Sequence, residues 1–154
     1  MDAQHAWKAT KPASLAGYLE ALSRPIFSTG MSWKVIEAKW DGIREAFDEF
    51  DPERVAALTP DDVDRLVGDT RVIRNRKKIE ATIHNAATMI ELDREHGGFE
   101  RYLGSLGSYD ETVAGLRREF RFLGESGAYI FLWSVAQPVP SHEEWAKTHG
   151  KRVA

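Results

Sequence analysis

Cysteine is absent from this sequence of 154 residues, and so is any long uninterrupted apolar run. Without cysteine the chain has no disulfide framework, no thiolate metal ligand and no thiol nucleophile, which fits a reducing compartment. Without about 18 consecutive apolar residues, we expect neither a membrane span nor a signal peptide. Both absences favour a soluble, cytoplasmic protein that has no membrane partner.

Basic residues are also outnumbered, since 21 Lys and Arg accompany 24 Asp and Glu and the formal net charge is -3. This balance excludes a protein covered in positive charge, but it does not exclude a local patch. The basic run, residues 71–78 (RVIRNRKK), contains five basic side chains and no acidic one. Such a run either faces an anionic partner such as nucleic acid or is a solvated helix start. The candidate DNA contacts in it are Arg74, Arg76, Lys77 and Lys78.

The hydrophobic pattern of the sequence is mainly helical. The chain is long enough for one domain with a real core, and 42% of its residues are hydrophobic. Apolar residues recur at helical spacing almost throughout, and no strand pair or internal repeat is visible. We therefore expect an all-α, single-domain fold. Its expected parts are a flexible N-terminal segment (1–12), a helical domain (13–145) and a C-terminal tail (146–154).

Proline and capping residues mark the expected helix boundaries. The first helix is expected to end before Pro25, because proline disfavours helical geometry at the residue that precedes it. The next helix is expected to run from Trp33 to about Phe50. Asp51 and Thr59, each followed directly by proline, are typical N-caps and predict two short helices.

A long helix and a pair of helices joined by a short interruption are predicted in the second half of the chain. Asn75 caps the long helix, which ends at a pair of glycines. Ser108 and Glu111 then form a capping box at the start of the next helix. The stretch EFRFLG interrupts the helical pattern before a strongly apolar helix begins near Glu125. The unit from 109 to 136 is therefore predicted to be a helix-hairpin-helix.

Small residues open the second helix of this unit. Gly124, Ser126 and Gly127 leave backbone N–H groups unobstructed, and a helix N-terminus with such amides binds phosphate. The alternative is an ordinary helical corner in which the glycines allow close packing. Arg121, in the hairpin itself, joins these three residues as a candidate DNA contact.

Trp33 begins an apolar stripe on one helical face. The members of the stripe fall at i, i+3, i+7, i+10 and i+14, and they are Trp33, Ile36, Trp40, Ile43 and Phe47. Trp33 is either the first rung of the core or the wall of a cavity in which a flat group stacks. The periodicity is compatible with both.

Two blocks of the sequence resemble the DNA-3-methyladenine glycosylase I family, within the helix-hairpin-helix superfamily of DNA glycosylases. Residues 30–86 are similar to the family's Gly-Leu-Ser-Trp helix, its Phe-Asp-Pro turn and its Ile-Ile-Arg-x-Arg-x-Lys-Ile run. Residues 120–142, FRFLGESGAYIFLWSVAQPVPSH, are similar to its hairpin, the following helix and the next loop. The resemblance extends from about Tyr18 to His142, with the pieces in the same order.

This resemblance implies a DNA repair enzyme that hydrolyses an N-glycosidic bond. Such a glycosylase rotates an alkylated base out of the duplex into a central cleft and stacks it against aromatic walls. The implied partner is double-stranded DNA that contains an alkylated base, and the protein is expected to be a monomer without a cofactor. Trp33 matches the family's pocket tryptophan, and Trp7 and Tyr18 are candidates for further pocket aromatics.

The sequence departs from the family at several functional positions. On an ungapped alignment, Pro25 takes the place of the glutamate that contacts the base. Pro140 takes the place of an aspartate of the wider superfamily, which glycosylase I also lacks. Only His142 matches the family's zinc site of cysteines and histidines, so no metal is expected. The catalytic residue is unknown, and the candidate carboxylates, each alternatively a solvated surface acid, are Glu37, Glu125 and Glu143.

Three functions are compatible with these observations. The first is a divergent, zinc-free glycosylase, the second is a non-catalytic binder of damaged DNA, and the third is a structural or regulatory helical protein. We place the first ahead, because the match covers the pocket helix as well as the hairpin, although a fold alone does not determine function.

Overall fold

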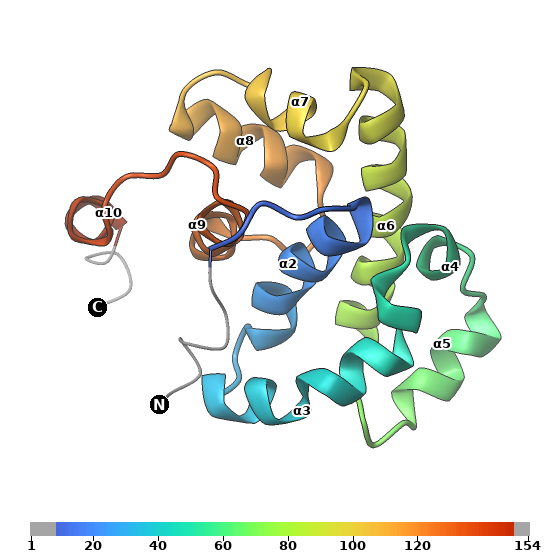
Figure 1. Cartoon of the computed structure of the whole chain (residues 1–154). Coiled ribbons are helices and arrows are strands. Elements are labelled where there is room, and N and C mark those ends of the chain that lie inside the picture. The colour runs from blue at the N-terminus through green and yellow to red at the C-terminus, as the bar shows by residue number, and fades with distance from the viewer. Residues whose placement is uncertain (1–8, 150–154) are drawn as a thin grey trace.

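The computed structural model describes residues 9–149, and within that range every regular element is a helix. This confirms the all-α prediction (Figure 1). The elements are α2 (Leu15–Ser28), α3 (Trp33–Ala46), the 3-10 helix η1 (Asp48–Phe50), α4 (Pro52–Ala56), α5 (Pro60–Val67), α6 (Arg76–His96), α7 (Phe99–Gly104), α8 (Tyr109–Glu119), α9 (Glu125–Ser134) and α10 (His142–His149).

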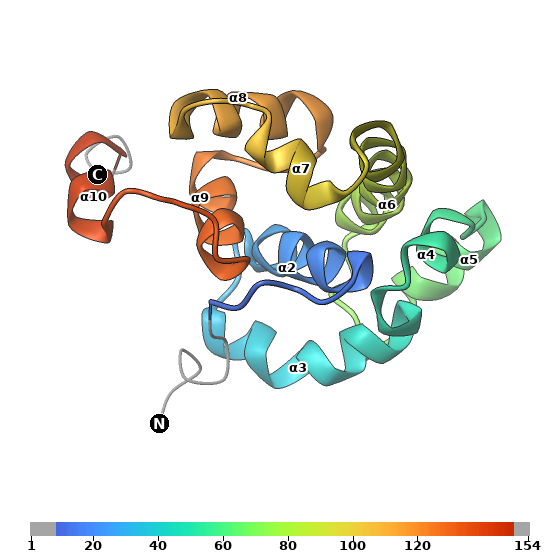
Figure 2. The same cartoon turned by 45° about the horizontal axis from the view of Figure 1, so that its top comes forward.

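Helix α2 lies at the centre of the molecule. In both views α3 lies on one side of α2, and α7 and α8 lie on the other (Figures 1 and 2). The 21-residue α6 runs past both groups and contacts α2, α4, α5 and α7. The two halves of the fold are therefore connected by α2 and α6.

The predicted N-caps are confirmed. The Thr59 hydroxyl accepts from the Asp62 amide while the Asp62 carboxylate accepts from the Thr59 amide, and Ser108 and Glu111 form the same reciprocal pair. The bond from the Thr59 amide, together with the Arg65 guanidinium, lowers the pKa of Asp62 to about 2. Caps are predictable because both partners lie within one turn of the chain.

The predicted end of the first helix before Pro25 is wrong, because α2 continues through Pro25 to Ser28. Proline inside a helix costs roughly 3 kcal/mol. Ile26 and Phe27, however, are almost completely buried, and burying each such side chain stabilises the fold by about 1.5–3 kcal/mol. The combined burial of the two side chains outweighs the local preference of proline.

The helix that begins at Trp33 also ends earlier than predicted, at Ala46 instead of near Phe50. The chain reverses over residues 48–50, where all three φ angles are positive, between 54° and 58°. This reversal turns Phe50 into the core, where its ring stacks 5.6 Å from the rings of both Phe47 and Trp40. Aromatic packing therefore ends α3.

The C-terminal part contains a further helix, α10, which crosses the boundary expected at residue 145 and reaches His149. Its Trp145 ring lies 5.0 Å from the Tyr129 ring, and the Tyr129 hydroxyl donates to the Pro140 carbonyl at 3.0 Å. Near the other end, the Thr10 amide donates to the Ser134 carbonyl at 2.9 Å, while residues 1–8 lie outside the described part.

Within residues 9–149, no helix has both the length and the apolar content that a membrane crossing requires.

The aromatic core makes a first prediction. Phe47 is fully buried, and its ring lies 5.7 Å from Phe27 and 5.6 Å from Phe50. Phe47→Ala should lower the free energy of unfolding by about 3–5 kcal/mol, because a cavity replaces the ring. Val35→Ala on the exposed face of α3, the helix that ends just before Phe47, should change the free energy of unfolding by less than about 0.5 kcal/mol. Urea unfolding measures both, and equal losses would contradict this core assignment.

Candidate base cavity and nucleic-acid interface

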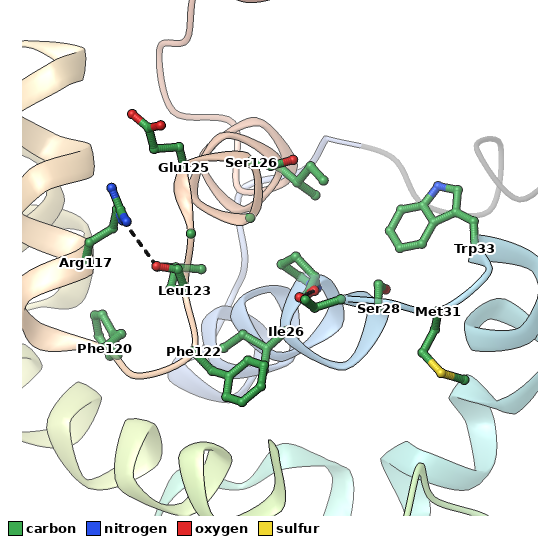
Figure 3. A pocket seen from close by; sticks show the side chains of 15 residues that line it. Ile26, Ser28, Met31, Trp33, Arg117, Phe120, Phe122, Leu123, Glu125 and Ser126 are labelled. Carbon is green, nitrogen blue, oxygen red and sulfur yellow. Dashed lines mark hydrogen bonds between the residues drawn. The ribbon is translucent and has the colours of Figure 1, made fainter. Parts of the chain in front are cut away.

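A cavity of about 830 Å³ lies between the C-terminal end of α2, the start of α3 and the hairpin that joins α8 to α9 (Figure 3). Its size is within the range of small-molecule sites, about 300–1,000 Å³. The loop wall, within residues 25–33, contributes Pro25, Ile26, Ser28, Thr29, Met31 and Trp33. The hairpin wall, within residues 120–127, contributes Phe120, Phe122, Leu123, Gly124, Glu125, Ser126 and Gly127, and Arg117 and Ile130 complete the lining.

Trp33 lies at the rim of this cavity. The next members of its stripe, Ile36 and Trp40, are 1% and 3% exposed, whereas Trp33 is 36% exposed. Gly30, with φ of 77°, reverses the chain after α2, and the Ser32 side chain caps α3 by accepting from the Lys34 amide. The residues of the stripe therefore belong to the core, except for Trp33, which borders the cavity.

Tyr18 does not belong to the cavity lining, contrary to the prediction. It is 6% exposed, and its ring packs 5.2 Å from the Phe99 ring in the core. Burial raises the pKa of its hydroxyl. Tyr18 lies near the start of α2, whereas the cavity begins at the other end of that helix. Trp7, the other candidate aromatic, lies outside the described residues.

The three candidate carboxylates have different positions. Glu125 lines the cavity, and among the lining residues, all of which the structure describes, it alone carries a carboxylate. Glu37 is not in the lining, and it pairs with Arg24 at 3.6 Å. Glu143 is exposed on α10 and is also absent from the lining. Pro25, at the position of the family's glutamate, does line the cavity.

The start of α9 forms one edge of the hairpin wall. Gly124 is its N-cap, and no side chain caps the helix. The first amides of α9, those of Glu125, Ser126 and Gly127, therefore belong to a helix N-terminus of the kind that attracts anions. Gly127 also has a packing role, since a Cβ there would lie 3.2 Å from the Leu123 side chain and 3.7 Å from that of Pro25.

The hairpin itself has an unusual conformation. Phe122 has a φ of 64°, which costs about 1–3 kcal/mol for a residue other than glycine. It lines the cavity, and 41% of the residue is exposed. Arg121 is also exposed. Its backbone N–H donates to the Asn85 side chain at 2.8 Å, and its carbonyl accepts from the same amide at 3.1 Å. Sequence reasoning missed both Phe122 and Asn85.

The side chains of the basic run differ in their environment: some are exposed, some are paired with acids and one is buried. Arg76 pairs with Asp64 at 2.6 Å, so its charge is already compensated. Lys78 is 3% exposed, and its ammonium donates to the carbonyls of Phe27 at 3.0 Å and Thr29 at 2.6 Å. The prediction that Lys78 contacts a phosphate is therefore wrong. Arg74 and Lys77 are exposed, and neither makes an ion pair within 4.0 Å to another described residue.

The zinc site of the family does not fit this chain. It has no cysteine, and among residues 9–149 no three His, Asp or Glu side chains gather to hold a metal ion. His142, which matches one ligand position, instead stacks on Trp145 with their ring centroids 6.4 Å apart.

An all-helical fold in which a hairpin between two helices borders a cavity of this size is typical of the helix-hairpin-helix class. The sequence matches the model of the methyladenine glycosylase family over residues 5–121. The chain belongs to that family, as the resemblance of its two sequence blocks predicts.

Two curated relatives and one solved structure show how close the similarity is. The DNA-3-methyladenine glycosylase 1 of Escherichia coli is 30% identical over an alignment of 124 positions, and the match covers 67% of this chain and 66% of the relative. The DNA-3-methyladenine glycosylase of Haemophilus influenzae is 27% identical over an alignment of 127 positions, and the match covers 69% of each chain. The match therefore spans about two thirds of these relatives.

The solved structure is that of 3-methyladenine DNA glycosylase I from Staphylococcus aureus, described for its recognition of 3-methyladenine. It has a TM-score of 0.74 at 26% identity, and the superposition covers 83% of this chain and 79% of the other. The similarity of fold therefore extends over most of the chain.

The exposed part of the basic run makes a second prediction. Arg74→Gln combined with Lys77→Gln should weaken binding to duplex DNA of any sequence and reduce the log-log salt slope by about one unit per lost contact. Arg71→Gln is the matched control, because Arg71 is held at 2.7 Å by Asp69 and at 2.8 Å by Glu45. Titrations at several salt concentrations measure the slopes. An unchanged slope in the double variant would mean that these side chains are only solvated.

Proposed function

We propose that this protein excises an alkylated purine, above all 3-methyladenine, from double-stranded DNA by hydrolysis of the N-glycosidic bond. The observation that supports the proposal best is Trp33, which lies at the rim of a cavity large enough for a base, beside a helix N-terminus without a side-chain cap. Family membership and the names of the relatives point the same way. The proposed partner is alkylated duplex DNA, on which a monomer acts in the cytoplasm.

Binding would divide between two kinds of contact. One phosphate would lie against the first amides of α9, near the exposed Arg121, and other phosphates would lie against Arg74 and Lys77. These contacts fix the position of the duplex but do not recognise a base. The alkylated base would turn out of the stack and lie against Trp33, where its π face and the indole are attracted. An alkylated purine that carries positive charge gains further from the face of a tryptophan.

When the base is cationic, its departure needs no proton from the protein. The bond between the sugar C1′ and the base nitrogen breaks with both electrons going to the base, which leaves as a neutral purine. Water adds to C1′ and loses a proton. Glu125 is the lining carboxylate that would offset the charge on the sugar and accept this proton. Because Glu125 acts as the base and Pro25 offers no second carboxyl group that could act as an acid, the cavity favours cationic lesions over neutral ones, whose departure needs an acid.

Trp33 provides the third prediction. Trp33→Ala should weaken the affinity for free 3-methyladenine and slow its release from methylated DNA by about 5- to 150-fold, since a base stacked on an aromatic ring gains about 1–3 kcal/mol. Trp33→Phe, which keeps an aromatic face, should lose much less. Release of the methylated base under single-turnover conditions measures the rate. Equal activity of the alanine variant and the unchanged protein would exclude the stacking role.

A non-catalytic binder of damaged DNA is the second candidate, favoured by the missing carboxylate at Pro25. Folded protein at stoichiometric amounts should release 3-methyladenine from methylated duplex DNA if the first proposal holds. No release of either 3-methyladenine or 7-methylguanine would overturn it. Tight binding to a duplex with an abasic-site analogue would then support the second candidate, and loss of both activities would leave a structural role.

Glu125 and Pro25 provide a fourth prediction about the reaction itself. Glu125→Gln should slow release of the base without weakening affinity for an abasic-site duplex, because it removes a negative charge but keeps the shape of the side chain. Pro25→Glu should accelerate release, provided that α2 stays intact by circular dichroism. If Glu125→Gln retains full activity, Glu125 is a surface carboxylate and water is activated without it.

A further inference from the structure

One face of α6 carries three buried polar side chains, which is unusual for the interior of a small domain. Lys78, Thr82 and Asn85 are 3%, 0% and 1% exposed. Their spacing of i, i+4 and i+7 places them above one another on a single helical face. The phosphate contacts and the chemistry proposed above use none of these three side chains.

Lys78 holds the loop wall of the cavity. Its ammonium donates to the carbonyls of Phe27 and Thr29, which belong to the C-terminal end of α2. Among the described residues no carboxylate lies within 4.0 Å of it, and burial lowers its pKa. A buried cation that is compensated only by carbonyl groups is costly. The negative end of the α2 dipole offsets part of that cost.

Asn85 holds the hairpin wall in a corresponding way. Its side-chain amide donates to the Arg121 carbonyl at 3.1 Å and accepts from the Arg121 N–H at 2.8 Å. Both backbone polar groups of one hairpin residue are therefore bound by a single side chain from another helix. The next residue is the strained Phe122, and α9 begins three residues after it, at Glu125.

We infer that Lys78 and Asn85 are positioning residues that set the distance between the two walls of the base cavity. Lys78 positions Trp33 through the end of α2, and Asn85 positions the phosphate-binding start of α9 through the hairpin. This inference rests on the proposed function. A rigid helix between the two attachment points keeps the flipped base and its flanking phosphate in register, and a misplacement of about 1 Å can cost a hundredfold in rate.

The two residues should have separable effects, because each holds a different wall. Loss of the Lys78 contacts releases the wall that bears Trp33 and so reduces affinity for the base. Loss of the Asn85 contacts releases the hairpin and so reduces affinity for the DNA backbone. A residue that merely stabilised the fold would weaken both affinities together.

The experiment compares Lys78→Met, Asn85→Leu and a matched control, Thr82→Val. Thr82 lies between the other two on the same face, but the hydrogen bond of its hydroxyl stays within α6, where it donates to the Lys78 carbonyl. For each folded variant, one titration measures affinity for free 3-methyladenine and another measures affinity for a duplex with an abasic-site analogue. Single-turnover release of the base gives the rate.

We expect Lys78→Met to weaken free-base binding by roughly tenfold to a hundredfold and duplex binding by less than about threefold. Asn85→Leu should show the reverse pattern, and both variants should release the base more slowly. Thr82→Val should stay within about twofold in every measurement. Where a variant does not fold, Lys78→Gln or Asn85→Ser replaces it, because each keeps a polar group at the site.

The outcomes separate this inference from the function on which it rests. If the unchanged protein binds neither the free base nor the abasic duplex, the proposed function fails and the inference fails with it. If the unchanged protein binds both, but the two variants lose both affinities equally or lose neither, the proposed function stands and the positioning role is wrong.

Discussion

The end of α2 is fixed by a buried ammonium group, and the cavity begins where that helix ends. Lys78 donates to the Phe27 and Thr29 carbonyls, so the backbone at the end of α2 is bound by a side chain of α6. Gly30 then reverses it, and Ser32 caps α3 one residue before Trp33. The position of the tryptophan at the rim therefore depends on a contact that starts in α6.

The same helix, α2, serves the core and the cavity at once. Phe27 packs on Phe47 and Trp40, with ring centroids 5.7 and 6.4 Å apart, while the neighbouring Pro25 lines the cavity and approaches Gly127 of α9. Core stability and the shape of the cavity are consequently linked. Substitutions in the second half of α2 should be interpreted with a measurement of folding beside each measurement of function.

Helix boundaries that depend on neighbouring residues could be predicted from the sequence. Boundaries and side-chain roles that depend on contacts between distant segments could not. The capping pair of Thr59 and Asp62 lies within one turn, so its helix start was predictable. The continuation of α2 through Pro25 was not predictable, because it depends on the burial of Ile26 and Phe27, which outweighs the helix-breaking preference of proline. Lys78 was assigned to DNA from its neighbours in the basic run. Only the structure shows that Lys78 shares an inward face of α6 with Asn85, because the burial of both depends on helices that are distant in the sequence.

The central claim is that the cavity beside Trp33 holds the alkylated base, and titration with free 3-methyladenine tests it most directly by NMR. The indole N–H signal of Trp33, assigned by its loss in Trp33→Phe, should shift more than those of the other tryptophans. The signal of Trp40, which is buried and donates to Glu20 at 2.8 Å, should stay in place. A saturable shift at other residues with none at Trp33, or no shift anywhere, would contradict this account.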